Sequence, residues 1–276
     1  MWLSWDNAAL LAAALGVVGL GARRARDRAL RATSAFAVEA SLVAALYSVW
    51  QFVGQLPHRG VGGAMGHARW IVHVQRLLLL PSERVLQQEV LGHPLIVQAA
   101  NVFYAVVHVP ALGIFLVWLF ARHRSRYPRY RNALAVLTFT CFLIHLIPVA
   151  PPRLLAGSGF VDTAVRYHQS VYGPVGTGIS DQVSAMPSLH LAWACLIAVA
   201  VIQVSPSRWR WLVLAHPVLT MYVVVVTGNH FWLDGIAAAI LVAASLALVD
   251  GAGRLRRRRR AACPAPEQPR PTLQRA

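Results

Sequence analysis

The sequence predicts an all-α polytopic membrane protein, a helix bundle with about seven transmembrane helices, on three observations. Hydrophobic residues make up 57% of the 276 residues and charged residues only 13%, whereas soluble domains carry about 25% charged residues. The apolar residues fall into long blocks, each close to the length that crosses a bilayer. The net charge of +16 comes from 26 arginines between these blocks and in the tail. This placement indicates a bilayer environment rather than a nucleic-acid partner.

Seven apolar blocks follow one another along the chain, at residues 3–22, 32–56, 95–121, 132–150, 187–205, 211–228 and 231–249. Each is near the ~20 residues that cross about 30 Å of hydrocarbon. The first block begins with Asp6 and is followed by arginines, which reverses the order of charges in a cleaved signal peptide. We therefore predict an uncleaved first helix whose N-terminus lies outside.

The arginines alternate in density from one connecting segment to the next. Residues 23–31, 122–131, 207–210 and the tail after residue 250 together contain twenty arginines. Residues 57–94 and 151–186 are longer stretches but contain only six. By the positive-inside rule the first group is cytoplasmic. The prediction is a multi-pass plasma-membrane protein with its N-terminus outside and its C-terminus in the cytoplasm.

The two segments expected outside differ in character. Residues 57–94 place apolar side chains at helical spacing among Arg and Gln, which predicts short amphipathic helices in the membrane interface with a break at Pro81–Ser82. Residues 151–186 are rich in Gly, Pro and Ser and predict an ordered loop or lid. The resulting domains are an N-terminal transmembrane helix with its Arg-rich loop (1–31), a membrane core (32–250) and a disordered basic cytoplasmic tail (251–276).

Four ionisable residues lie near the expected outer ends of three helices: Arg153, His190, His230 and Asp234. Charged groups within spans are costly and are therefore functional candidates. His230 and Asp234 are four residues apart and would share one helix face. The carboxylate would accept one imidazole N–H and leave the other nitrogen electron-rich, as an activated nucleophile or base. The alternative is a structural His–Asp pair at a helix start.

The segment SAMPSLH predicts an anion site. Pro187 suits the first turn of a helix, so the N–H groups of Ser188, Leu189 and His190 would point outward to an anion. Arg153 follows two prolines and supplies a cation that grips phosphate oxygens in bidentate fashion. The alternatives are an ordinary helix start and an arginine that snorkels to the interface.

Together these residues indicate phosphoryl transfer. A metal site is a competing use of two histidines and an aspartate. Neither an HExxH motif nor a carboxylate cluster accompanies them in the sequence, so we expect no metal and no cofactor.

Other polar residues within the apolar blocks have weaker functional signals. Tyr104 and His145 are candidates for lining a cavity below the site, or for hydrogen bonds between helices. The interhelical alternative is favoured for His108, deep within its block. Glu39 lies too far from the outer site and is expected to pair between helices. His216 is expected to be structural.

The motifs PSLH at 187–190 and HFWLD at 230–234 resemble motifs two and three of the type 2 phosphatidic acid phosphatase superfamily. The stretches APPR at 150–153, RLLLLPSERVLQQ at 76–88 and NVFYAVVH at 101–108 are similar to its inositolphosphotransferase branch, which includes inositol phosphorylceramide synthase. The resemblance covers about residues 70–250. It implies a six-helix phosphatase core preceded by one extra helix.

This resemblance implies a role for each site residue. His230 would be the nucleophile that forms a phosphohistidine, Asp234 would orient it, and His190 would protonate the leaving oxygen. The phosphoryl oxygens would be held by Arg153, Ser188 and Leu189.

Two cations of the superfamily are absent from this sequence. Leu146 stands where the first motif has lysine, and Val223 and Val224 stand where the third has Ser-Arg, as in the inositolphosphotransferase branch. Candidates to balance the phosphate charge are Arg76 and, in the outer loop, Arg166, Tyr167 and His168.

The function implied is that of a metal-independent enzyme at the outer membrane face, acting on a lipid phosphate or phosphodiester. Its partner would be a phospholipid or other phosphorylated lipid substrate in the bilayer. The sequence does not choose between water and an alcohol as acceptor, and it sets no oligomeric state. The alternative is a non-catalytic lipid-binding or transport protein of the membrane.

Overall fold

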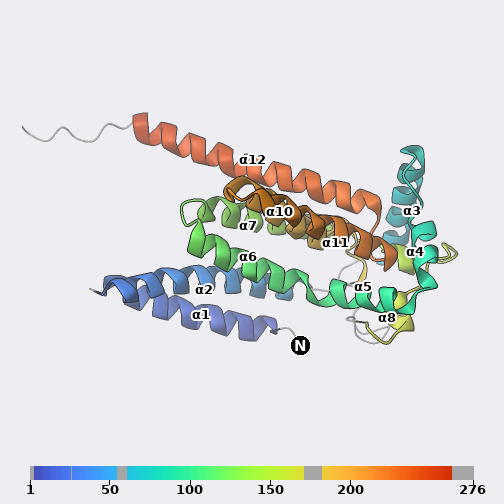
Figure 1. The fold of residues 1–276 in the computed structure, drawn as a ribbon, viewed down its shortest axis with the longest axis horizontal. Helices are drawn as coiled ribbons and strands as arrows, with labels where there is room; N and C mark the ends of the chain where they lie inside the picture. The colour runs from blue at the N-terminus through green and yellow to red at the C-terminus, as the bar shows by residue number, and fades with distance from the viewer. Residues whose placement is uncertain (1–2, 26, 55–60, 171–181, 263–276) are drawn as a thin grey trace, which may run out of the picture.

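The structure is a computed structural model that describes residues 3–25, 27–54, 61–170 and 182–262. Over these ranges the chain is helical, and the only extended pairing is an isolated bridge between Val149 and Ser184. Figure 1 shows the long helices lying side by side along one direction. This confirms the predicted all-α membrane bundle.

The helices that correspond to the seven apolar blocks are α1 (Trp5–Gly21), α2 (Arg28–Gly54), α5 (Pro94–Val106) with α6 (His108–Arg122), α7 (Tyr127–His145), α10 (Leu189–Val204), α11 (Ala215–Val226) and α12 (Trp232–Ala262). Four helical stretches within the described ranges are long and apolar enough to cross a membrane: Trp5–Arg24, Ala29–Val49, Arg208–Val226 and Trp232–Arg259. The α5–α6 pair makes a fifth if it is counted as one span. The count of seven therefore stays a prediction.

The third apolar block forms two helices instead of one. The axes of α5 and α6 differ by 49° at the break between Val106 and His108. Pro110 accounts for the bend, because it has no N–H for the carbonyl of Val106 and its ring crowds that turn. The bend sets the direction of α5 relative to α6 close to the candidate site.

The Arg-rich connections lie together at one end of the bundle. In Figure 1 the α1–α2, α6–α7 and α10–α11 connections and the C-terminal half of α12 are toward the left. The helices α3 (Val61–Leu77), α4 (Glu83–Leu91) and α8 (Thr163–Arg166) are at the right. The break between α3 and α4 includes Pro81 and Ser82, as the sequence predicted. The connections that are rich in arginine in the sequence are thus all at the same end of the bundle.

The C-terminal boundary differs from the expectation. The last helix continues through Ala262, so residues 251–262 are helical and not disordered, while 263–276 lie outside the described residues. Ala, Leu and Arg are strong helix formers, and arginines near a helix C-terminus interact favourably with its dipole. Arg129 also donates two hydrogen bonds of 2.7 Å to the carboxylate of Asp250 in this helix.

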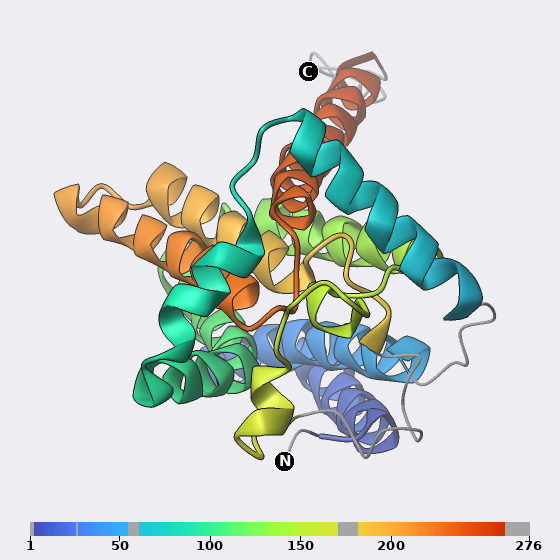
Figure 2. The same cartoon turned by 90° about the vertical axis from the view of Figure 1, so that its right-hand side faces the viewer.

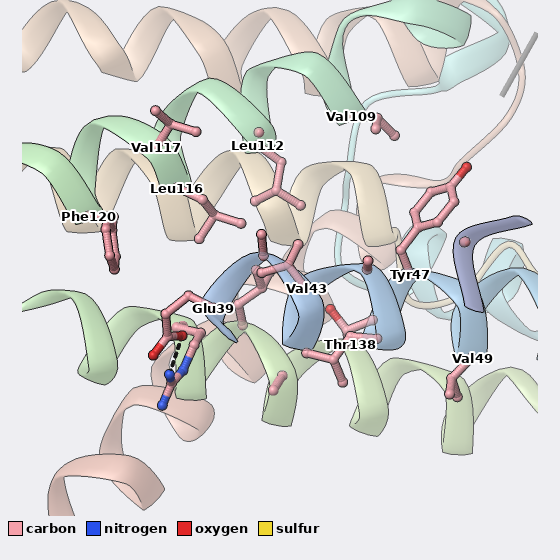
Figure 3. A pocket seen from close by; sticks show the side chains of 18 of the residues that line it. Glu39, Val43, Tyr47, Val49, Val109, Leu112, Leu116, Val117, Phe120 and Thr138 are labelled. Carbon is pink, nitrogen blue, oxygen red and sulfur yellow. Dashed lines mark hydrogen bonds and ion pairs between the residues drawn. The ribbon is translucent and has the colours of Figure 1, made fainter. Parts of the chain in front are cut away.

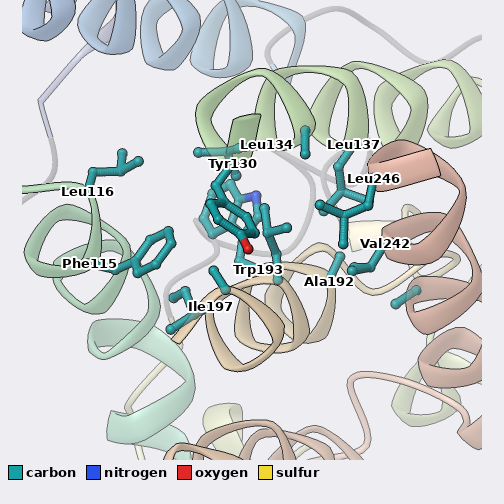
Figure 4. Close-up of a cluster of buried hydrophobic side chains, with 14 of the residues drawn as sticks. Phe115, Leu116, Tyr130, Leu134, Leu137, Ala192, Trp193, Ile197, Val242 and Leu246 are labelled. Carbon is teal, nitrogen blue, oxygen red and sulfur yellow. The ribbon is translucent and has the colours of Figure 1, made fainter. Parts of the chain in front are cut away.

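The largest core cluster surrounds α10. Figure 4 shows side chains of α6, α7, α10 and α12 converging, among them Phe115, Leu137, Trp193 and Leu246. All four are buried. The packing fixes the position of the central helix α10. It therefore also fixes the residues at the N-terminal end of α10, where the site lies.

The helices α1 and α2 form a hairpin that packs through small residues. The hydroxyls of Ser34, Ser41 and Ser48 donate to carbonyls of α1 at 2.5, 2.6 and 2.6 Å. A Cβ at Gly19 would lie 2.7 Å from Cγ2 of Val38, so the backbones approach too closely for a side chain there. The hairpin meets the core through an ion pair between Glu39 and Arg131, which confirms that Glu39 pairs between helices.

We expect Glu39→Leu to lower the free energy of unfolding by about 2–3 kcal/mol, because Arg131 would be left as an uncompensated charge at a largely buried site. The double variant Glu39→Leu/Arg131→Leu should recover most of this loss. Thermal unfolding in detergent micelles measures both. A single variant as stable as the unaltered protein would show that the pair contributes nothing.

Candidate active site

His230 lies in the turn between α11 and α12. The turn begins after Val226 and includes Gly228, which has a φ of +68°. Its backbone is tied to α11, because the N–H groups of Asn229 and His230 both donate to the carbonyl of Val224 at 2.9 and 3.1 Å. His230 therefore precedes the helix that contains Asp234 and does not share a helix face with it.

The imidazole of His230 has a fixed tautomer. Its Nδ1 is 2.7 Å from the carbonyl oxygen of Ala185 and 3.3 Å from Oδ2 of Asp234. A carbonyl only accepts hydrogen bonds, so Nδ1 carries the proton and Nε2 has the lone pair. The carboxylate was the expected acceptor, but the shorter bond goes to the carbonyl. Both acceptors favour the same tautomer and leave Nε2 nucleophilic.

Asp234 also organises the start of α12. Its Oδ2 accepts the N–H of Phe231 at 2.8 Å, which is the reciprocal half of a capping box. Its own carbonyl accepts the N–H of Ser188 at 3.4 Å. The side chain is fully buried. Asp234 thus links the His230 turn to the segment that begins α10.

The first turn of α10 begins later than the sequence predicted. Ser188 is the N-cap, its Oγ accepts the N–H of Leu191 at 3.3 Å, and Leu189 is the first helical residue. Pro187 therefore precedes the cap and is not in the first turn. Serine is a strongly preferred N-cap, which explains the shift. The Ser188 hydroxyl therefore caps the helix, and the backbone N–H of Ser188 donates to the carbonyl of Asp234 at 3.4 Å, so neither group faces an anion as the sequence predicted. Anion binding by the N–H groups of Leu189 and His190 stays a prediction.

His190 lies between two aromatic rings and faces His230. Its ring centroid is 4.5 Å from that of Tyr104, 4.7 Å from that of His108 and 6.1 Å from that of His230. Tyr104 is near the end of α5 and His108 begins α6, so the bend between these helices presents both rings to His190. The structure therefore places Tyr104 at the site.

His108 and His145 make contacts between segments. Nε2 of His108 lies 3.3 Å from Oγ1 of Thr220 in α11, which confirms the expected interhelical contact. Nε2 of His145 donates to the carbonyl of Pro187 at 2.9 Å. His145 thus holds the segment that leads into α10, and this hydrogen bond joins α7 to a connecting segment and not to another helix.

Arg153 is anchored beside the His230 turn. Its Nη1 donates to Oδ1 of Asn229 at 2.6 Å, its Nε lies 3.1 Å from Oδ2 of Asp162, and its backbone N–H donates to the carbonyl of Gly228 at 3.0 Å. Only 3% of the side chain is exposed. It does not snorkel, and Asp162 balances part of its charge.

Arg166 and His168 lie farther along the same outer segment. The guanidinium of Arg166 is 5.7 Å from the ring centroid of Tyr167, and His168 occupies the left-handed region with a φ of +54°. Within the described part of the chain, neither makes a contact with His190 or His230. The structure does not bring them into the site.

Three polar side chains on α3 and α4, which the sequence did not indicate as site residues, fix the site. Gln75 Oε1 accepts the N–H of Leu233 at 3.0 Å and Glu83 Oε1 accepts that of Trp232 at 3.1 Å. These are first-turn donors of α12 without an intrahelical partner. Gln87 donates to the carbonyls of Val226 and Val161 at 3.0 Å each. Figure 2 shows α3 and α4 crossing this end of the bundle.

The arrangement places a candidate nucleophile next to a second imidazole and near a cation. The ring of His230 lies beside that of His190 in the first turn of α10, and Arg153 is hydrogen-bonded to Asn229, the residue before His230. Among the described residues, no group of three or more His, Cys, Asp or Glu side chains is arranged to hold a metal ion.

The residues that match a known protein family include the whole site. The family model described as the PAP2 superfamily matches residues 69–248. This range includes α4 to α11, most of α3 and α12, and every residue of the site; the α1–α2 hairpin precedes it. No curated protein and no solved structure matches the chain.

We expect Gly228→Ala to lower both the activity and the unfolding temperature. The left-handed backbone costs an alanine about 1–2 kcal/mol, and its Cβ would lie 3.1 Å from Cβ of Arg153. Gly66→Ala is the matched control, because a Cβ there meets no atom within 4 Å. Thermal unfolding and phosphate release measure the two effects. Equal behaviour of the two variants would contradict the role given to Gly228.

Proposed function

Because the chain belongs to the PAP2 superfamily, which comprises phosphatases acting on phosphorylated substrates, we propose that it is a metal-independent lipid phosphatase or head-group phosphotransferase. The observation that carries this proposal is the hydrogen bond of His230 Nδ1 to the carbonyl of Ala185 at 2.7 Å. It leaves Nε2 as the nucleophile, next to a second imidazole.

The reaction proceeds in two steps. His230 Nε2 attacks phosphorus, the bond from phosphorus to the leaving oxygen breaks, and His190 gives that oxygen a proton. In the second step His190 takes a proton from water or an alcohol, whose oxygen attacks the phosphohistidine and releases His230. Asp234, 3.3 Å from Nδ1, stabilises the positive charge that the ring acquires on phosphorylation.

The phosphoryl charge is met by Arg153 and the N-terminus of α10. The N–H groups of Leu189 and His190 lie in the first turn of this helix, where free donors and the helix dipole favour an anion. Val223 and Val224 are buried aliphatic residues and supply no charge. A site with fewer cations than most of the superfamily suits a phosphodiester as well as a monoester, which supports head-group transfer to an alcohol alongside hydrolysis.

The substrate is a phosphorylated lipid that enters from the outer leaflet. The site lies at the end of the bundle that has α3 and α4, opposite the Arg-rich connections (Figure 1). The amphipathic helix α3 has exposed apolar side chains such as Trp70 and Leu77, as expected for a helix in the membrane interface. The positive-inside rule assigns this end to the outside.

We expect the two histidines to respond differently to the leaving group. His190→Ala should lose at least about 100-fold on a lipid phosphate, because an alkoxide needs the proton of a general acid. It should retain far more activity on p-nitrophenyl phosphate, whose leaving group needs no proton. His230→Ala should be inactive on both substrates, because the attacking nitrogen is gone. Phosphate release in the presence of EDTA measures all of these rates.

His93→Ala is the control for this experiment, because His93 is an exposed histidine at the same end of the bundle. It should match the unaltered protein. Rescue of His230→Ala by p-nitrophenyl phosphate, with His190→Ala inactive on both substrates, would reverse the two roles. Activity abolished by EDTA and restored by magnesium would overturn the metal-independent mechanism.

We expect labelling from outside the cell to reach the site end only. With Cys141, Cys195 and Cys263 replaced, a cysteine at Val165 on α8 should react with an impermeant thiol reagent in intact cells. A cysteine at Arg126, between α6 and α7, should react only after permeabilisation. Both positions are exposed on the protein, so the side of the membrane on which each cysteine lies decides whether the reagent reaches it. The reverse pattern would place the site in the cytoplasm.

A further inference from the structure

A cavity of about 430 Å³ lies between the α1–α2 hairpin and the core. Its walls come from α1, α2, α6, α7 and α10, and almost all of its lining is aliphatic or aromatic. Figure 3 shows Val43 and Tyr47 of α2 facing Val109, Leu112 and Leu116 of α6 across this space. Its size is that of a ligand pocket, and its lining offers little to a polar ligand.

The cavity exists because of a part of the chain outside the family region. The family match begins at residue 69, whereas both helices of the hairpin end before residue 55. The phosphatase core alone supplies only the wall formed by α6, α7 and α10. The hairpin therefore adds the second wall to a core that already contains the site.

Two contacts form the floor of the cavity, at its Arg-rich end. The rings of Phe36 and Phe120 meet edge to face at 5.7 Å between centroids, and Glu39 pairs with Arg131 beside them. All four residues line the cavity. Figure 3 shows Phe120 and the ion pair at the opposite end of the cavity from Val109 and Tyr47.

The depth of the cavity matches one leaflet. Phe120 follows His108 by twelve residues of α6, which is about 18 Å at a rise of 1.5 Å per residue. Half of a hydrocarbon core of about 30 Å is about 15 Å. A chain that starts at the level of the histidines and reaches the floor therefore crosses the outer leaflet once.

The upper end of the cavity is one helical turn from the site on three helices. Trp193 follows His190 by three residues on α10, and Leu112 follows His108 by four on α6. On α7, Phe142 precedes His145 by three residues, and their ring centroids are 6.4 Å apart. Trp193, Leu112 and Phe142 all line the cavity. For a lipid whose phosphate lies at His190 and His230, the cavity thus begins about one helical turn further along α10.

We propose that this cavity holds an acyl chain of the substrate lipid and that the α1–α2 hairpin makes the enzyme selective for long chains. This inference rests on the proposed function, since it assigns the chain of the same substrate whose phosphate reacts at His230. A chain that fills the cavity gains dispersion contacts with its walls, which an empty space forfeits. A chain too short to reach the floor leaves the lower part empty and gains less.

A large side chain at Gly113 would fill part of the cavity. It lines the cavity on α6, and a Cβ there meets no atom within 4 Å. We expect Gly113→Phe to lower kcat/KM for a sixteen-carbon lipid phosphate at least tenfold more than for a six-carbon analogue. Gly21→Phe is the matched control, because Gly21 also has open space but does not line the cavity. It should leave the ratio of the two rates unchanged.

Ala44→Phe tests the same expectation from the opposite wall, since Ala44 lines the cavity on α2. Equal rate losses on both chain lengths in the two cavity variants would overturn the inference while leaving the proposed function intact. No turnover of either lipid by the unaltered protein would overturn the proposed function instead.

A photoreactive lipid phosphate tests the cavity without turnover. We expect a diazirine near the end of its acyl chain to cross-link Leu116 or Phe120 in the unaltered protein, and Gly113→Phe to lose this labelling. Mass spectrometry of peptides locates the cross-link. Labelling confined to bilayer-facing residues such as Ile114, which is 71% exposed on the same helix, would show that the cavity takes no chain.

Discussion

The hydrogen bond between His230 Nδ1 and the carbonyl of Ala185 is the interaction on which the site depends. It joins the turn after α11 to the segment before α10 and fixes the tautomer of the ring. The Ser188 N–H adds a second link, to the carbonyl of Asp234. His190 and His230 are 40 residues apart in the chain, and these two hydrogen bonds hold together the segments that contain them. The position of the His230 ring is thus set by backbone carbonyls as much as by the carboxylate.

Buried backbone groups outside regular helices require hydrogen-bond partners from within the protein. The carbonyl of Val226 and the N–H groups of Trp232 and Leu233 are satisfied by Gln87, Glu83 and Gln75. All three of these side chains are buried. The helices α3 and α4 therefore have a structural task in the site. They hold the start of α12 and, with it, Asp234.

The bend between α5 and α6 and the α1–α2 hairpin shape the surroundings of the site. The bend brings Tyr104 and His108 against His190. The hairpin is tied to the core by Glu39 and Arg131 and leaves an apolar space below the same histidine. The proposed chemistry and the proposed acyl-chain cavity thus meet at α10, which has a fixed position because it lies at the centre of the largest core cluster (Figure 4).

The sequence by itself predicted the helical membrane class and which connections are rich in arginine. It also indicated His190, His230, Asp234 and Arg153 as candidate site residues. These follow from composition, block length and residue type, which are local properties. Only the tertiary structure decided that Ala185 accepts from His230, that Ser188 caps α10 and that Asp162 faces Arg153. It also decided that Gln75, Glu83 and Gln87 complete the site. Such contacts join residues far apart in the chain, and a backbone carbonyl has no sequence signature, so their partners are set by packing alone.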